Sequence, residues 1–286
     1  MLREIRELGF EYAELSHGTR ISLVPGIVEA VEAGEIKISS LHNFCPLPMG
    51  VNFAAPNLHQ FSDDRPRERE LAERHTLKTI EFAARLQAPA VVLHCGSIEM
   101  KNYTDKLLDM AGRQEQESDK YRSLCEEMES KREARKEKPF QRVLESLKKL
   151  VGEASPRAIR LGVENRQALE ELPIESDYQF LFREIDTPVL AYWHDTGHAQ
   201  IKENLGFIQH AMHLESLQDK LLGLHIHDVQ PPGRDHCAPG TGRVDFAALK
   251  PFVKPAHLKV FEFSPSLSVE DAKAGVAHVK RIWGEM

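Results

Sequence analysis

The sequence predicts an α/β fold, a (β/α)8 TIM barrel that lacks its first strand and carries a charged helical insertion. Short apolar runs that suit buried strands alternate with helical stretches along the 286 residues, and this alternation requires a parallel sheet with helical crossovers. Chemically active side chains recur where those strands end, which is where a barrel builds its site. No Gly-x-Gly-x-x-Gly follows a strand, which disfavours the competing fold, a doubly wound open sheet. We expect one domain over residues 1–286.

The first half of the chain predicts three strands, each preceded by a helix. Apolar residues at helical spacing and closing glycines mark the helices, and Pro25 suits a first helical turn. In chain order the elements are helix 2–8, strand 10–15, helix 25–33, strand 36–41, helix 63–86 and strand 90–93.

Residues 102–152 interrupt this alternation with a strongly charged, helix-prone stretch. Its mixed charges predict a solvated pair of helices that is broken near Pro139. An exposed excursion is one interpretation, and a partner surface or a lid over the site are the others. Because an extended charged hairpin could join two copies of the chain, a homo-oligomer is one of our predictions.

The alternation then resumes and brings the predicted strands to seven. The elements are strand 158–163, helix 176–185, strand 188–193, helix 205–217, strand 221–226, short helix 246–253, strand 258–263 and helix 269–282. Eight strands would close a barrel of about 250 residues. Since the chain opens on a helix, we expect the missing strand to be the first. A late start, a trimmed sequence or a barrel open at this point would each explain it.

Composition limits the classes of function. No run of about 18 apolar residues exists, so we expect no membrane span, and the N-terminus lacks the apolar core of a signal peptide. The net charge of −7 argues against a broad nucleic-acid-binding face. The four cysteines form no Cys-x-x-Cys pair, which suits a reduced, cytoplasmic setting.

The side chains at the strand ends are all potential metal ligands. They are His42, His94, Glu164, Asp195 with His198, His225 with His227, and Glu262. A chance set of polar strand ends would also include Ser, Thr, Asn and Lys, so the joint pattern indicates a metal site at the barrel mouth. The remaining histidines fall on helices or loops and are expected at the surface or in packing; among them are His59, His75, His210, His213, His257 and His278.

Simpler interpretations exist for single members of this set. His42 and His94 could each cap a strand, and Glu164 could pair with Arg166. His225 and His227 face the same side by period two, so we expect one to bind metal and the other to support a ligand. Glu262 lies between two phenylalanines, where a buried carboxylate needs a partner such as a metal.

The Gly- and Pro-rich loop 231–243 follows the strand that carries His225. Its composition predicts a shaped turn. Arg234, His236 and Arg243 could grip an anionic or polyhydroxylated substrate, and the alternative is a plain connecting loop.

Five short motifs mark a family resemblance. They are Gly162-Val163-Glu164-Asn165, Asp195-Thr196-Gly197-His198-Ala199, Leu224-His225-Ile226-His227-Asp228, the Pro-Gly-Thr-Gly turn at 239–242, and Phe261-Glu262-Phe263. With them the chain resembles the xylose isomerase-like TIM barrel superfamily, which includes sugar phosphate isomerases/epimerases and endonuclease IV. The resemblance covers nearly the whole chain apart from the insertion and the missing strand.

The epimerase branch implies one divalent metal, Mn²⁺, Zn²⁺, Co²⁺ or Mg²⁺. Its ligands would match Glu164, Asp195, His225 and Glu262. In this branch the two glutamates, here Glu164 and Glu262, would also exchange the substrate proton. His198 and His236 would contact substrate, and the loop looks most like that of hydroxypyruvate isomerase-type members. Our full prediction for substrate binding is His42, His94, His198, His227, Arg234, His236 and Arg243.

The endonuclease branch binds three zinc ions, with added ligands that match His42, His94, His198 and His236. The aspartate that precedes the loop histidine by two in that branch falls at Arg234 in this chain. This departure puts a complete third zinc site in doubt.

Three hypotheses of function follow. The leading one is a divalent-metal-dependent sugar or sugar-phosphate isomerase/epimerase, acting by proton transfer through a metal-stabilised enediolate. The second is a zinc-dependent phosphodiesterase resembling endonuclease IV, which His42 and His94 favour and which the net charge and Arg234 disfavour. The third is a barrel that binds a sugar or a protein partner without turnover.

Overall fold

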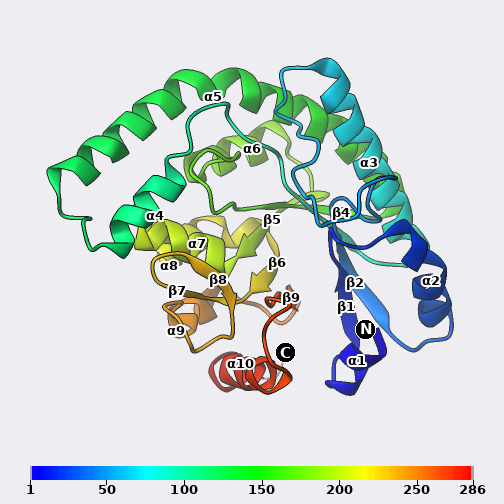
Figure 1. The fold of residues 1–286 in the computed structure, drawn as a ribbon. Coiled ribbons are helices and arrows are strands. Elements are labelled where there is room, and N and C mark those ends of the chain that lie inside the picture. The colour runs from blue at the N-terminus through cyan, green and yellow to red at the C-terminus, as the bar shows by residue number, and fades with distance from the viewer. Residues whose placement is uncertain (1, 285–286) are drawn as a thin grey trace. The chain divides into compact units, whose positions relative to one another are not determined.

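The computed structural model describes residues 2–284, and the chain divides into two compact units. Unit 1 comprises the described residues of Met1–Ser97, Lys138–Glu164 and Phe180–Ala191, and unit 2 those of Ile98–Glu137, Asn165–Gln179 and Tyr192–Met286. Seven parallel strands follow one another in chain order through the sheet, β1-β2-β3-β4-β5-β6-β9 (Figure 1). This confirms the predicted barrel fold with seven strands, while the single domain over 1–286 stays a prediction.

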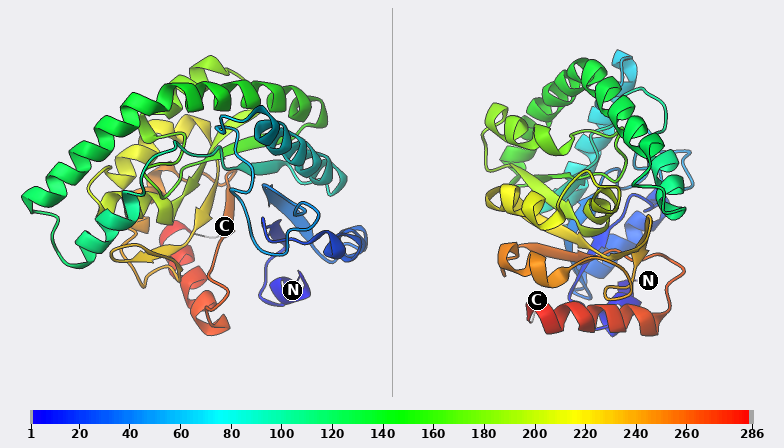
Figure 2. Two further views of the ribbon diagram at one scale, coloured as in Figure 1. Left: turned by 45° about the horizontal axis from the view of Figure 1, so that its top comes forward. Right: turned by 90° about the vertical axis from the view of Figure 1, so that its left-hand side faces the viewer.

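Unit 1 holds the first four strands and the helices that cover them. The strands are β1 (Tyr12–Leu15), β2 (Lys37–His42), β3 (Ala90–Leu93) and β4 (Arg160–Glu164); the helices are α1 (Leu2–Glu7), α2 (Val24–Glu32), α3 (Pro66–Arg85) and most of α6 (Tyr178–Glu184). All four residues of β3 are fully buried, as expected of a parallel strand covered on both faces. Helix α3 packs on β2 and β3 (Figure 2) and buries Ala72, Ile80 and Ala83.

Unit 2 holds most of β5 (Leu190–Asp195) together with β6 (Leu221–Ile226) and β9 (Leu258–Phe261). Its helices are α4 (Thr104–Gly112), α7 (Thr196–Asn204), α8 (His210–Leu217), α9 (Phe246–Leu249) and α10 (Val269–Trp283). In the register of the sheet, Asp195 lies opposite His225, and His225 lies opposite Val260. The carboxyl ends of β5 and β6 therefore bring two predicted ligands side by side.

The charged insertion is a pair of helices, but the predicted break near Pro139 is wrong. Helix α5 (Asp119–Ala154) runs through Pro139, and the break lies at residues 113–118. A proline inside a helix costs about 3 kcal/mol. Burial of Val143, Leu144 and Leu147 on the same helix outweighs that cost, because each buried side chain contributes about 1.5–3 kcal/mol.

The insertion also contributes a core of its own in unit 2. Tyr103, Leu107, Tyr121 and Met128 are buried in one cluster with Ile201 and Leu205 at α7. The Tyr121 hydroxyl donates to the Leu205 carbonyl at 2.9 Å. The insertion is therefore packed against the barrel helices of this unit and is not a freely solvated excursion.

The predicted helix 205–217 is wrong at its start, because two helices occupy this region. Helix α7 begins at Thr196, directly after β5, and α8 begins at His210. Thr and Gly have low helix propensity, but the Asp195 carboxylate accepts the backbone N–H of His198 at 2.7 Å and caps the helix. Gly206, with φ of +86°, ends it, as glycine commonly does.

An antiparallel hairpin that the sequence did not predict includes the first part of the loop 231–243. Strands β7 (Asp228–Gln230) and β8 (Arg234–Cys237) pair across Pro231, Pro232 and Gly233. The carboxylate of Asp228 then accepts four backbone N–H groups at 2.8–3.0 Å, those of Val229, Gly240, Gly242 and Val244. One buried aspartate thus organises the Pro-Gly-Thr-Gly turn. Among residues 2–284, no helix is long and apolar enough to cross a membrane.

Candidate metal centre

Three predicted ligands meet in unit 2, at the carboxyl ends of its strands. Asp195 is the last residue of β5, His225 lies on β6, and Glu262 follows β9. His225 Nδ1 lies 3.3 Å from Glu262 Oε2 and 3.8 Å from Asp195 Oδ2. The side chains of Asp195 and His225 are fully buried, whereas that of Glu262 is 25% exposed.

This donor set fits a divalent cation. At metal–ligand distances of about 2.0–2.2 Å, neighbouring donors in tetrahedral or octahedral geometry lie about 3.0–3.5 Å apart, close to the distances around His225. Two carboxylates facing one imidazole in a buried position also need a compensating positive charge. Imidazole with carboxylate suits Zn²⁺, Mn²⁺ or Co²⁺.

Hydrogen bonds from neighbouring residues hold both the backbone and the carboxylate of Asp195. The Asn165 side chain accepts the Asp195 N–H at 2.6 Å and donates to the Asp195 carbonyl at 3.0 Å. The carboxylate caps α7 through His198 N–H, and the helix N-terminus favours a negative charge there. These bonds fix the backbone of Asp195 and one oxygen of its carboxylate.

Unit 1 gathers two of the predicted histidines on Glu164, the last residue of β4. Glu164 Oε2 lies 2.7 Å from His94 Nε2 and 3.3 Å from His42 Nε2. The Asn43 carbonyl lies 3.0 Å from His42 Nδ1 and can only accept, so His42 carries a proton on Nδ1. In a neutral His42 ring the Nε2 lone pair then faces a carboxylate oxygen of Glu164, and the two repel each other. A cation shared between them, or a second proton on the ring, would remove this repulsion.

Sequence reasoning missed His17. Its ring lies 4.8 Å from the His42 ring, edge to face, and 6.4 Å from the His94 ring. The signal was available, because His17 follows a predicted strand just as His42 and His94 do.

The histidines predicted to contact substrate in unit 2 occupy different settings. His198 is buried, and its Nδ1 donates to the Asn165 carbonyl at 2.9 Å. His236 is half-buried and stacks on His227 with ring centroids 4.3 Å apart. Burial alone would lower the pKa of His236, but the carboxylates of Asp235 and Glu262 raise it to about 10. His227 is fully buried.

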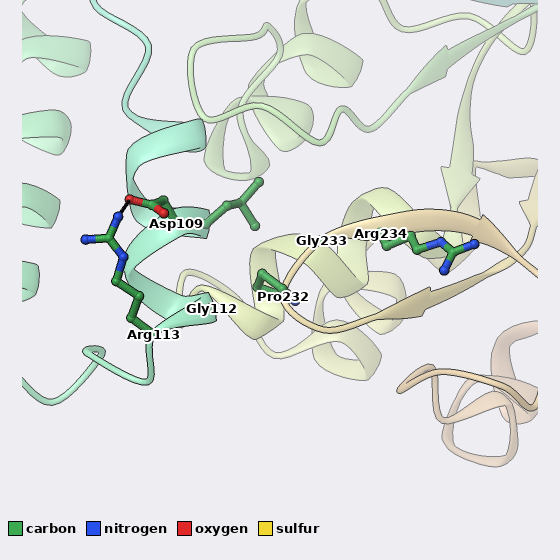
Figure 3. A pocket seen from close by; sticks show the side chains of 7 residues that line it. Asp109, Gly112, Arg113, Pro232, Gly233 and Arg234 are labelled. Atoms are coloured by element: carbon green, nitrogen blue, oxygen red, sulfur yellow. Dashed lines mark hydrogen bonds and ion pairs between the residues drawn. The ribbon is translucent and has the colours of Figure 1, made fainter.

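Arg234 and Arg243, also predicted to bind substrate, are both exposed. Arg234 lines an open cavity of about 510 Å³ between α4 and the β7–β8 hairpin, with Arg113 at its other side. In Figure 3 the two guanidinium groups point away from each other, and Arg113 pairs with Asp109 at 2.5 Å. The cavity therefore presents no convergent set of cationic donors.

A second group of buried histidines lies on the other face of β5. The Tyr192 hydroxyl lies 2.8 Å from His194 Nδ1 and 3.0 Å from His213 Nε2, and His194 Nε2 lies 2.9 Å from His210 Nε2. Burial lowers the pKa of His210 to about 3 and that of His213 to about 4. These rings are packing residues, as predicted for His210 and His213.

Known structures of similar fold include several sugar epimerases. A D-tagatose 3-epimerase-like protein is 18% identical with a TM-score of 0.70, over 98% of this chain and 90% of that chain. A 3-keto-D-glucoside 4-epimerase from E. coli is 16% identical with a TM-score of 0.68, over 98% and 92%. D-psicose 3-epimerase from Clostridium cellulolyticum H10, with D-tagatose, is 12% identical with a TM-score of 0.66, over 99% and 92%.

At these identities the likeness shows the fold. No curated protein matches the chain. The family model described as xylose isomerase-like TIM barrel matches residues 2–260. The chain therefore belongs to the xylose isomerase-like TIM barrel family.

Proposed function

We propose that the chain is a metal-dependent sugar isomerase or epimerase that moves a proton at a carbon next to a carbonyl group. One divalent cation would bind Glu164, Asp195, His225 and Glu262. The observation that carries the proposal is the buried His225 imidazole, whose Nδ1 has a carboxylate oxygen at 3.3 Å and another at 3.8 Å.

Glu164 is the fourth proposed ligand because of its chain neighbour, Asn165. Asn165 follows Glu164 directly. Its side chain accepts a hydrogen bond from the Asp195 N–H and donates one to the Asp195 carbonyl. Glu164 is therefore joined by one peptide bond to the residue that holds the Asp195 backbone. Both glutamate and aspartate also end parallel strands, β4 and β5, that follow each other in the sheet order.

A bound cation would polarise the substrate carbonyl as a Lewis acid. Glu262 would then accept the proton from the neighbouring carbon, and Glu164 would return one, with the roles reversed in the back reaction. His198 and His236 would orient hydroxyl groups of the sugar. The named substrates of similar structures, D-tagatose and D-psicose among them, make a ketose the first compound to test.

The test is carbon–hydrogen exchange of ketoses and their phosphates in D₂O, followed by NMR. Loss of a general acid–base carboxylate costs about 10²–10⁴-fold in rate, so Glu262→Gln is expected to lose exchange by that factor. Glu270→Gln, which removes an exposed carboxylate on α10, is the matched control and should retain it. Full exchange by Glu262→Gln would remove Glu262 from the mechanism.

A zinc-dependent phosphodiesterase is the second candidate, and one observation favours it. In unit 1 the imidazoles of His42 and His94 both lie within 3.3 Å of Glu164 Oε2, a donor set for an additional ion. Metal analysis separates the two candidates. About one equivalent of metal favours proton exchange, whereas two or three equivalents of zinc with hydrolysis of abasic-site DNA favour the phosphodiesterase.

A further inference from the structure

His227 is fully buried, and both of its ring nitrogens are hydrogen-bonded in unit 2. The His236 backbone N–H lies 2.9 Å from His227 Nδ1. Because a backbone N–H can only donate, His227 Nδ1 must carry the lone pair. The ring proton of neutral His227 is therefore on Nε2, which lies 3.0 Å from one oxygen of Asp195 and 3.1 Å from the other.

Three consecutive residues form a socket for this ring. The Asp195 carboxylate accepts the Nε2–H of His227. The Thr196 hydroxyl accepts the His227 backbone N–H at 3.1 Å and donates to the His227 carbonyl at 2.7 Å. A Cβ atom added to Gly197 would lie 2.0 Å from His227 Cε1, so only glycine leaves room for the imidazole.

We propose that His227 is a positioning residue, held in the Nε2–H tautomer, that orients Asp195 for the cation. In this role His227 would act through Asp195 and not by binding the cation itself. The proposal rests on the proposed function for the role of the cation, whereas the tautomer itself does not depend on any activity. Hydrogen bonds of this kind to a metal-binding group fix its rotamer, and their loss typically weakens metal binding about 10–100-fold.

The same ring connects the metal centre to the hairpin that carries Arg234 and His236. Its Nδ1 accepts the backbone N–H of His236 on β8, and its Nε2–H donates to the carboxylate of Asp195. His236 also stacks on it with an interplanar angle of 7°. Metal binding and the position of β8 are therefore coupled through one imidazole, since a shift of either end moves the other.

The first experiment measures the tautomer in the metal-free protein. Histidine labelled with ¹⁵N is incorporated, and the His227 resonances are assigned by their loss in His227→Gln. We expect a pyridine-like Nδ1 and a pyrrole-like Nε2. A pyrrole-like Nδ1 or a doubly protonated ring at neutral pH would overturn the proposal, whatever the enzyme activity.

The second experiment compares three variants by competition titration of Co²⁺ into the metal-free protein and by the Co²⁺ absorption spectrum. His227→Gln can keep the donor to Asp195 and should bind within about threefold of wild type. His227→Asn keeps only the acceptor, and His227→Phe keeps only the ring; both should bind about 10–100-fold more weakly, with a changed spectrum.

The outcomes separate the two proposals. Unchanged Co²⁺ affinity and spectrum in His227→Phe would overturn the positioning role. Absence of any Co²⁺ binding by the wild type would overturn the proposed function, and the tautomer measurement would still decide whether His227 donates to Asp195. If His227→Phe does not fold, His227→Asn against His227→Gln gives the same comparison.

Discussion

Acid should destabilise the metal-free protein through His213, and His213→Gln should remove part of that effect. The unfolded chain takes up a proton at His213 near pH 6.5, whereas burial holds the pKa of the folded side chain at about 4. Between these pH values the unfolded state binds more protons. The contribution of His213 to stability is therefore fully present above pH 6.5 and is lost as the pH falls toward 4.

The magnitude follows from the two pKa values. The difference between 6.5 and about 4 corresponds to about 3 kcal/mol once the loss is complete, and most of this is lost by about pH 4.5. At neutral pH, His213→Gln disturbs one hydrogen bond to Tyr192 and should cost about 1 kcal/mol. The order of stability should therefore cross, with the variant more stable than wild type near pH 4.5.

The assay is urea unfolding of the metal-free protein from about pH 7.5 to about 4.5, because metal ligation would add its own pH dependence. Tyr192→Phe is the matched control, since it breaks the same hydrogen bond and keeps the imidazole. It should follow the wild-type pH dependence. If His213→Gln and wild type change in parallel over this range, burial does not hold His213 neutral and the reasoning is refuted.

Two further substitutions probe the packing around the site. Gly197→Ala should weaken Co²⁺ binding at least tenfold, because its Cβ would lie 2.0 Å from His227; Gly152→Ala on α5, where nothing lies within 4 Å, is the control and should stabilise the protein by about 0.5–1 kcal/mol. Wild-type Co²⁺ affinity in Gly197→Ala would argue against a tight socket. Asp228→Asn should lower the free energy of unfolding by about 3 kcal/mol or more, because four backbone N–H groups converge on its carboxylate. Asp245→Asn, at an N-cap with two such bonds, should cost less than about 0.5 kcal/mol, because asparagine caps a helix about as well as aspartate; equal losses at both positions would contradict the role of Asp228.

The sheet and the ends of its strands could be predicted from the sequence because buried parallel strands are nearly all apolar. A polar residue that ends such a run, as Glu164 and Asp195 do, is conspicuous. The same rule applied to His17 would have added it to the histidines of unit 1. The position of each of these side chains along its strand could therefore be predicted from the sequence.

The roles of these side chains depend on contacts that local patterns do not encode. Period two suggested that His225 and His227 face the same side, but β6 ends at Ile226 and His227 lies beyond it. The tautomer of His227 is set by the backbone N–H of His236, nine residues away on the other side of the β7–β8 hairpin. The two prolines in this segment indicated a loop, so the hairpin was not predicted. Likewise, the start of α7 depends on the cap from Asp195 and not on the helix propensity of Thr196 and Gly197.

The two carboxylates beside His225 differ in a way that bears on their proposed roles. Asp195 is fully buried and is bonded to His198 N–H and His227. Glu262 follows a strand whose four residues are all partly exposed, and its side chain is 25% exposed. A proton acceptor must reach substrate and change its protonation state, which a carboxylate fixed by several donors does poorly. The burial pattern therefore suits Asp195 to holding a cation and Glu262 to exchanging a proton. Glu262→Gln tests the role of Glu262, and the His227 variants independently test the role of Asp195.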